Sequence, residues 1–347
     1  GILPARNTPK QGEKMENNDL IRTDAKEIAS PGNAPLPVKL KKRKKSLNER
    51  LFVIIMLAIP VIHFLVFFVY INIDTVVLTF QQKTLDGRYV FLDQPFRNYK
   101  EFFTTAFTSY SVFPKAIRNS IIFFLLNNVV IVPLSVILTY FLYKKMPLAN
   151  VFRIIFYLPS IISVVVLTML YRFMFDSSIG LFDSILRAVG LENLIPQFGW
   201  LGTKESALGL VIFYCIWSGL GGNIVLLTGA MKRIPVEIIE AGKLDGVGMF
   251  RELWSIVLPL IGTTLATLFM LGTTVIFTFF LQPKLLTNGN PNGETYTIAM
   301  YIVDNVKGDI GDLTMGATVG VICAIVGTPL VILTRKILDK AFPVYEY

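Results

Sequence analysis

Six long apolar runs constrain this chain more than any other feature of its sequence. Each is longer than about 18 residues, and at about 1.5 Å of rise per residue such a helix crosses a hydrocarbon core of about 30 Å. An open strand in lipid would leave its backbone groups without hydrogen bonds, so only helices fit these runs. The sequence therefore predicts an all-α, polytopic membrane protein with six transmembrane helices, at 51–73, 119–143, 154–175, 206–231, 256–282 and 315–333.

Composition agrees with this fold class and limits the partners. Hydrophobic residues make up 53% of the chain and charged residues only 16%, while the net charge is +9. Much of the positive charge lies in KLKKRKKSLNER at 39–50, directly before the first run. A basic cluster can bind nucleic acid, but beside a transmembrane helix it is typical of a topology signal, so we expect no nucleic acid partner. The first run is long enough to span, and we expect it to stay in the membrane rather than be cleaved as a signal peptide.

Basic residues also predict the orientation. The N-terminal tail, the loop with Lys144 and Lys145, and the C-terminal end with Arg335 and Lys336 fall on one side if the spans alternate, and the positive-inside rule makes that side cytoplasmic. The segment 74–118 is also basic and disagrees, but it is long and therefore weighs less. We predict the following regions: a disordered basic cytoplasmic tail (1–50), the first transmembrane helix (51–73), an extracytoplasmic segment (74–118), a five-helix core (119–335) with a cytoplasmic loop (232–255), and a cytoplasmic C-terminal tail (336–347).

The cytoplasmic loop contains an unusual charged stretch, EIIEAGKLDGVGMFRELWSIVLP at 237–259. Pro235 suits the first turn of a helix, and Gly246 suits a sharp turn. We therefore predict two short helices, 234–244 and 247–257, that form an elbow. Pro259 would lie in the first turn of the fifth span, where its missing N–H costs least.

This stretch resembles the EAA loop of bacterial ABC importer permeases. The family pattern is EAA, three residues, G, nine residues and I-x-L-P, and every position matches except the second alanine, which is Gly242 here. From about Arg97 onward, RNS at 118–120, FRIIFYLPSIIS at 152–163 and FDSSIGLFDSIL at 175–186 look like the carbohydrate-uptake subclass, the relatives of the maltose permease. That subclass carries LT-x-GGP-x-x-x-T after the fifth span. The run LLTNGNPNGETYT at 285–297 departs from it at Asn290, which puts the substrate class in question.

The resemblance implies a type I importer permease fold and a coupling function for the elbow. It implies that Glu240 pairs with a groove of an ATPase, that Ala241 and Gly242 permit close approach, and that Gly246 allows the turn; Asp245 completes this set. The implied partners are a second homologous permease chain, two ATP-binding cassette subunits that hold ATP and Mg, an extracytoplasmic solute-binding protein and a carbohydrate, in a bacterial cytoplasmic membrane. The sequence contains no G-x-x-x-x-G-K-[ST] phosphate loop, so we expect no catalytic residue, cofactor or metal in this chain.

Neutral polar and aromatic residues within the spans are candidates for a substrate path. A sugar offers hydroxyl groups and apolar C–H faces, which amides, hydroxyls and aromatic rings recognise. The alternative is that such residues hold membrane helices together. The candidates are Tyr214, Trp217, Asn223, Asn127, Ser163 and Thr273.

Other kinds of membrane protein fit this sequence less well. A secondary transporter needs ionisable groups in its spans, and His63 is the main candidate here. A structural or receptor-like protein needs no coupling elbow. An ABC permease for another solute, such as a peptide or glycerol phosphate, stays open. We predict an ABC importer permease that moves an oligosaccharide by alternating access.

Overall fold

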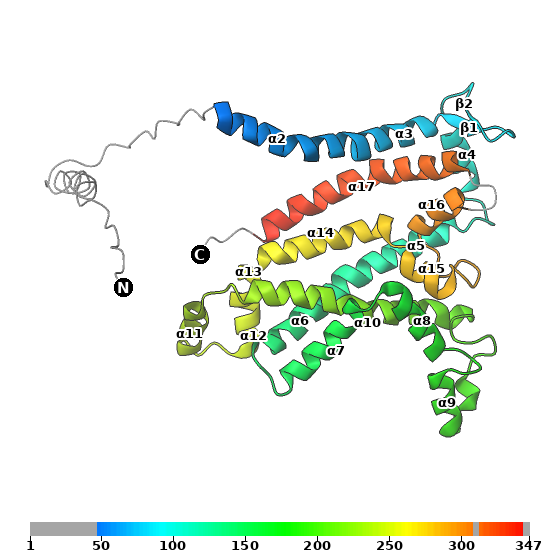
Figure 1. Ribbon diagram of the computed structural model, residues 1–347. Helices are drawn as coiled ribbons and strands as arrows, with labels where there is room; N and C mark the ends of the chain where they lie inside the picture. The colour runs from blue at the N-terminus through cyan, green and yellow to red at the C-terminus, as the bar shows by residue number, and fades with distance from the viewer. Residues whose placement is uncertain (1–46, 308–311, 343–347) are drawn as a thin grey trace, which may run out of the picture. The chain divides into compact units, whose positions relative to one another are not determined.

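The computed structural model describes residues 47–307 and 312–342 (Figure 1). The chain divides into two units, Gly1–Phe64 and Leu65–Tyr347. In the first unit the described element is α2 (Leu47–Phe64), so helix begins inside the predicted tail, and residues 1–46 of that tail lie outside the described part.

The second unit is almost entirely helical. A two-stranded antiparallel hairpin, β1 (Gln81–Lys83) and β2 (Tyr89–Phe91), interrupts the helices near its start. The helices before the elbow are η1 (Leu65–Tyr70), α3 (Ile71–Leu78), α4 (Arg97–Thr105), α5 (Phe113–Leu125), η2 (Leu126–Ile131), α6 (Val132–Tyr143), α7 (Ala149–Ile161), α8 (Val164–Met174), α9 (Leu181–Ala188), η3 (Glu192–Leu194) and α10 (Lys204–Met231). The elbow and later helices are α11 (Val236–Leu244), α12 (Met249–Glu252), η4 (Leu253–Val257), α13 (Leu258–Leu260), α14 (Gly262–Thr278), α15 (Leu281–Thr287), α16 (Ile298–Lys307) and α17 (Leu313–Ala341).

Four described helical stretches are long and apolar enough to cross a membrane, and two bent pairs raise the number to as many as six. The four are Leu51–Leu78, Phe113–Tyr143, Lys204–Met231 and Leu313–Ala341. The last continues past the predicted end at 333, into the region predicted as a tail. The second begins before the predicted start at 119.

The third predicted span is not one straight helix. α7 and α8 meet at 106°, because Ile162 and Ser163 have extended backbones. The apolar run continues through the bend, so hydropathy gave no sign of it. Pro159 lies in the last turn of α7, where its missing N–H weakens the helix.

The fifth predicted span is bent as well. The segments Met249–Leu260 and Gly262–Thr278 meet at 78°, with Ile261 at the bend. Pro259 therefore lies in α13, before the bend, and not in the first turn of the long helix α14. Residues 281–282, predicted in this span, start the separate helix α15.

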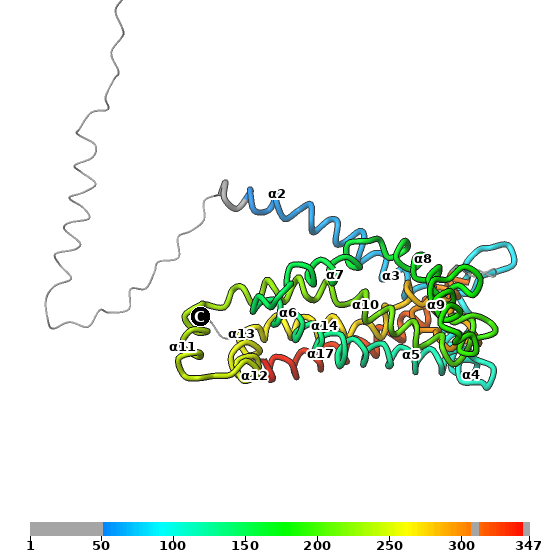
Figure 2. Tube along the Cα trace, turned by 90° about the horizontal axis from the view of Figure 1, so that it is seen from below, coloured from blue at the N-terminus to red at the C-terminus, as the bar shows by residue number. Residues whose placement is uncertain are grey.

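The long helix α10 is central to the packing of the second unit. It packs against α7 and α6, while α14 packs against α17 and α5. Two apolar clusters include residues of α10, one around Tyr171 and Tyr214 and one around Leu227 and Met231. Both views show the elbow (α11, α12) at one end of this unit, and α9, α15 and the hairpin at the other (Figures 1 and 2). Cys215 in α10 is buried, whereas Cys323 in α17 is half-buried.

Close approach of α10 and α7 depends on Gly221. A Cβ atom there would lie 2.7 Å from the carbonyl oxygen of Phe156 and 2.5 Å from Ser160 Oγ, whereas one on Gly222 would meet nothing within 4 Å. We predict that Gly221→Ala lowers the unfolding free energy by about 1–3 kcal/mol, because the backbone of α7 must move. Gly222→Ala is the control and should be neutral or slightly stabilising. Unfolding in mixed SDS micelles measures both, and equal effects would contradict the packing described.

Candidate functional site

The charged stretch forms the predicted elbow. α11 and α12 are separated by a turn in which Gly246 has a φ of +70°, a conformation that favours glycine. The second helix continues as η4 to Val257. The two predicted helices and the turn at Gly246 are thus confirmed, but each helix begins two residues later than predicted, and Pro235 precedes α11 instead of lying in its first turn.

The predicted coupling residues lie on different sides of the elbow. Glu240, Ala241, Asp245 and Gly246 are exposed. Gly242 is buried, and a Cβ atom there would lie 2.8 Å from Ile256 Cδ1. The small size of Gly242 therefore serves packing inside the elbow. The prediction that it keeps an outer face open for a partner is wrong, because the residue faces inward. The only atom within 4 Å of this Cβ position is the end of the flexible Ile256 side chain, so an alanine at 242 would require only that side chain to move.

Exposed apolar side chains accompany these charges. Leu244 is 89% exposed and Phe250 is 71% exposed, on the two arms of the elbow. Sequence reasoning missed them, because an apolar residue between charged ones is normally expected to face the interior of the protein. Exposed apolar side chains beside charged ones are typical of a surface that binds another protein.

The elbow is fastened to the end of α6 by polar contacts. Lys144 Nζ lies 2.5 Å from Glu252 Oε1, and Glu252 is only 3% exposed. The hydroxyl of Tyr140 donates to the carbonyl oxygen of Met249 at 2.9 Å. Sequence reasoning treated Lys144 as a topology signal and Glu252 as one of the loop's surface charges. The one feature of the sequence that could have indicated a buried ion pair is the position of Glu252, directly before the apolar stretch 253–259.

Apolar contacts add to this attachment. Ile239, Leu253 and Val257 of the elbow are buried in the same cluster as Val136 of α6 and Leu227 of α10. An ion pair and an apolar cluster thus both attach the elbow to α6, and the cluster also attaches it to α10.

A cavity of about 240 Å³ lies among η2, α7, α8, α10 and α14. Of the six predicted path residues, Asn127 and Tyr214 line it. The structure adds Ser160, and also Ser218 and Gln282, which sequence reasoning missed. The hydroxyl of Tyr214 is buried and has no hydrogen-bond partner among the described residues. An unpaired buried hydroxyl costs about 1–3 kcal/mol, so this position suits a polar guest.

The other four predicted path residues do not line this cavity. Trp217 packs edge-on against Tyr214 with ring centroids 6.3 Å apart. Thr273 is buried, and its hydroxyl donates to the carbonyl oxygen of Phe269 in its own helix. Ser163 is at the bend between α7 and α8, and Asn223 lies farther along α10. Their rotation about the helix axes could not be read from the sequence.

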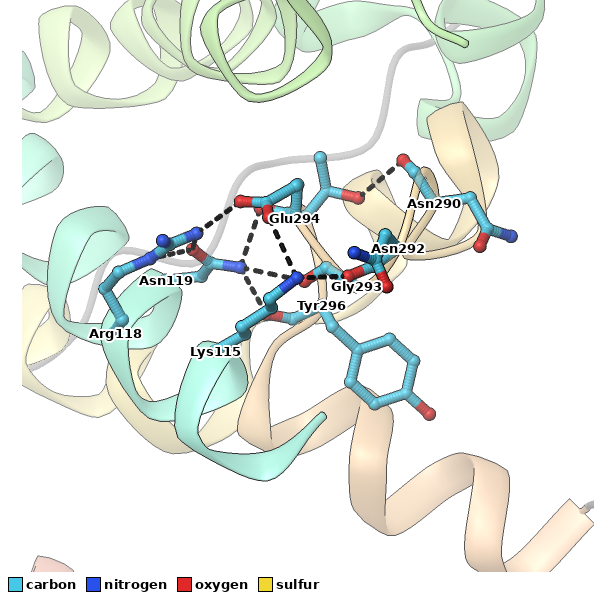
Figure 3. A network of polar contacts seen from close by, with 9 residues as sticks. Lys115, Arg118, Asn119, Asn290, Asn292, Gly293, Glu294 and Tyr296 are labelled. Atoms are coloured by element: carbon cyan, nitrogen blue, oxygen red, sulfur yellow. Dashed lines mark hydrogen bonds and ion pairs between the residues drawn. The ribbon is translucent and has the colours of Figure 1, made fainter. Parts of the chain in front are cut away.

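At the other end of the unit, a polar cluster holds the loop 288–297 against the start of α5 (Figure 3). Glu294 pairs with Lys115 at 2.9 Å and with Arg118 at 2.7 Å. Asn119 Nδ2 donates to the carbonyl oxygens of Glu294 (2.8 Å) and Tyr296 (2.9 Å). Hydrogen bonds from Arg118 and Lys115 hold the pKa of the Glu294 carboxyl below its usual range. This contact explains the RNS run: Ser120 completes it by accepting from the N–H of Ile298 at 3.0 Å.

A metal site is not evident in the described part of the chain. Within residues 47–307 and 312–342, no three His, Cys, Asp or Glu side chains come together as a metal ion would require.

Comparison with known proteins identifies the family. Residues 131–342 match the family model described as "Binding-protein-dependent transport system inner membrane component". The chain belongs to this family. The match includes the elbow and most of the residues that line the cavity, and it confirms the prediction of an importer permease, a transport subunit of an inner membrane.

Several curated permeases are similar in sequence. The diacetylchitobiose uptake system permease protein NgcF of Streptomyces coelicolor is 31% identical over 192 residues, which are 54% of this chain and 54% of that protein. The probable ABC transporter permease protein YurN of Bacillus subtilis is 29% identical over 259 residues, 74% of this chain and 85% of that protein. The arabinooligosaccharides transport system permease protein AraP of the same organism is 26% identical, covering 77% and 82%. The chain thus spans about half the length of NgcF and more of the other two.

Solved structures confirm the fold. A chain of a bacterial ABC transporter involved in the import of the acidic polysaccharide alginate has a TM-score of 0.71 at 21% identity, covering 84% of this chain and 96% of that one. A chain of the alginate transporter in complex with an alginate pentasaccharide-bound periplasmic protein has a TM-score of 0.70 at 20% identity, covering 86% and 97%. The predicted all-α, type I permease fold is confirmed.

The attachment of the elbow to α6 gives a testable prediction. Glu252→Gln should lower the unfolding free energy of this permease by about 2 kcal/mol, because it leaves the partly buried ammonium of Lys144 without its anion. The exposed Glu240→Gln is the matched control and should change it by less than about 0.5 kcal/mol. Unfolding in mixed SDS micelles measures both. Equal losses would mean that Glu252 does not anchor the elbow.

Glu294 gives a prediction about pH. Its folded pKa lies below the value of an unfolded glutamate, about 4.3, so its stabilisation is present above that pH and is lost as the pH falls through the folded pKa. Glu294→Gln should lower the unfolding free energy by about 1 kcal/mol at pH 7 and remove part of the loss below about pH 4. Asp86→Asn, at an exposed carboxyl in the β1–β2 turn, is the control. Parallel pH profiles for wild type and Glu294→Gln would contradict the assignment.

Proposed function

We propose that this chain is a permease subunit of an ATP-driven ABC importer that moves an oligosaccharide into the cytoplasm by alternating access. The observation that carries the proposal is the elbow. Its exposed Glu240, Leu244 and Phe250 face outward, while Glu252 fastens it to α6. Such an arrangement suits a part that receives motion from another protein and passes it on to helices as a rigid body.

The partner that supplies this motion would be a pair of ATP-binding cassette subunits. They would hold ATP and Mg, since this chain has no phosphate loop. Glu240 and Asp245 would pair with polar or basic groups of an ATPase groove, and Ala241 would allow that groove to approach closely. Gly242 and Gly246 would shape the elbow, through the contact with Ile256 and through the turn. A second, homologous permease would complete the membrane part.

The orientation follows from this assignment. The elbow and both termini would face the cytoplasm of a bacterium, and the end with α9, α15 and the hairpin would face outward, where a solute-binding protein would deliver the substrate. The names of relatives support a saccharide: diacetylchitobiose for NgcF and arabinooligosaccharides for AraP. The family match does not favour a secondary transporter.

The substrate path would pass through the cavity beside Tyr214. Asn127 and Tyr214 offer an amide and a hydroxyl to a sugar, and Trp217 would support the ring of Tyr214 from the side. Ser163, at the bend beside this cavity, and Asn223 and Thr273 would act in the path only if α8, α10 and α14 rotate during the transport cycle.

The proposal predicts that Glu240 couples the permease to its ATPase. In the complex purified from native membranes and reconstituted with its binding protein, Glu240→Ala should lower oligosaccharide uptake by about tenfold, because a central charged contact is lost. Glu237→Ala, one turn earlier on the exposed face of α11, is the control and should change uptake by less than about twofold. Purification without any ATPase, or equal effects of the two variants, would contradict the proposal.

A further inference from the structure

A second and larger cavity lies at the end of the unit opposite the elbow. Its volume is about 580 Å³, and it is formed by the end of α8, the segment 198–202, α15 and the residues that follow α15. It shares no lining residue with the cavity beside Tyr214. The coupling and path assignments above do not use it.

Aromatic rings form one wall of this outer cavity, and they are held in place. Trp200 Nε1 donates to Asp183 Oδ1 at 2.5 Å, and Asp183 is only 2% exposed. Phe175 stacks on Phe182 with ring centroids 4.3 Å apart and packs edge-on against Trp200 at 6.4 Å. Phe173 and Phe198 line the cavity as exposed rings. Fixed aromatic faces are suited to the apolar C–H faces of sugars.

Side-chain amides form the facing wall. Asn288 and Asn290 line the outer cavity, are exposed, and make no side-chain hydrogen bond within the described residues. The Glu294 cluster holds the loop that carries them, and the Asn290 side chain points away from that cluster (Figure 3). Asn290 stands where the carbohydrate-uptake pattern has a glycine, so it adds an amide to this wall. Free amides on a fixed loop can donate to and accept from sugar hydroxyls at a low entropic cost.

The charges around the outer cavity are balanced. Lys284 pairs with Asp304 at 2.6 Å, and the hydroxyl of Tyr296 also donates to Asp304. Asp176, which follows the end of α8, interacts electrostatically with Arg172, and both residues line the cavity. Asp176 Oδ1 accepts from the hydroxyl and the N–H of Ser178, and these bonds lower the pKa of the carboxyl. A polyanion would need an excess of positive charge, which this wall does not offer.

From these observations we infer that the outer cavity is a saccharide subsite that selects a neutral oligosaccharide over an acidic one. The inference rests on the proposed function, because it requires that this end of the permease faces the solute-binding protein. The rings of Trp200 and Phe198 would contact the sugar faces. Asn288 and Asn290 would hydrogen-bond its hydroxyls, and Arg172 would add a donor at the edge.

The test uses the complete transporter in lipid nanodiscs without its binding protein. The probes are three neutral pentasaccharides (maltopentaose, arabinopentaose and N-acetylchitopentaose) and a pentamer of uronic acids, and calorimetry measures the Kd of each. We expect saturable binding of at least one neutral probe and at least tenfold weaker binding of the uronate probe. Asn288→Gly and Asn290→Ala should each raise the Kd of the neutral probe about fivefold, as the loss of one hydrogen bond would.

Asn292→Gly is a matched control for Asn288→Gly. Both asparagines belong to the same loop and have a φ of 52°, which glycine adopts without strain, but Asn292 does not line the cavity. Its replacement should leave the Kd unchanged. The inference is overturned if the three variants behave alike, if no neutral probe binds, or if the uronate probe binds more tightly.

Uptake separates this inference from the proposed function. A transporter that imports an oligosaccharide from its binding protein, but whose Kd and uptake KM do not respond to Asn288→Gly, overturns the subsite and leaves the importer in place. A transporter that imports no oligosaccharide at all overturns the proposed function, and the subsite with it.

Discussion

The backbone's need for hydrogen-bond partners in hydrocarbon determines the rest of this structure. Helices satisfy their own N–H and C=O groups, so the apolar runs become helices, and irregular backbone is tolerated only where it lines a cavity or is covered by protein. The bend at Ile162 and Ser163 follows this rule, because Ile162 and Val164 line the cavity beside Tyr214. The bend between α7 and α8 thus places extended backbone next to the polar groups of the proposed path.

A partly buried ion pair links the elbow to the helices. Glu252 and Lys144 are joined at the end of α6, and the apolar cluster around Leu253 and Val257 excludes water from the same region. A buried pair of this kind adds little net stability compared with apolar residues, but it fixes one geometry, since each charge needs the other. We interpret the pair as a positioning contact, which fixes the orientation of α11 relative to α6 and α10.

The two ends of the permease use charge differently. At the elbow, exposed Glu240 and Asp245 stand beside apolar Leu244 and Phe250, a combination suited to a protein partner. At the opposite end, Glu294 pairs with both Lys115 and Arg118 in a cluster that holds a loop. The charges lining the outer cavity are likewise offset by neighbours, which leaves amides and aromatic rings as its available groups.

The sequence by itself determined the features that depend on local composition and spacing: the apolar runs, the two helices of the elbow with their turn at Gly246, and the resemblance of the EAA-like stretch to importer permeases, which the family match confirms. Only the tertiary structure decided the bends, the pairing of Lys144 with Glu252, and the contact of Asn119 with residues 293–296. It also decided that Asn127 and Tyr214 line one cavity while Trp217 stands behind it. The polar pairings join residues more than a hundred positions apart, and the lining of the cavity depends on how each helix is rotated about its axis. The bends fall inside continuous apolar runs. Hydropathy within such a run contains no information on any of these.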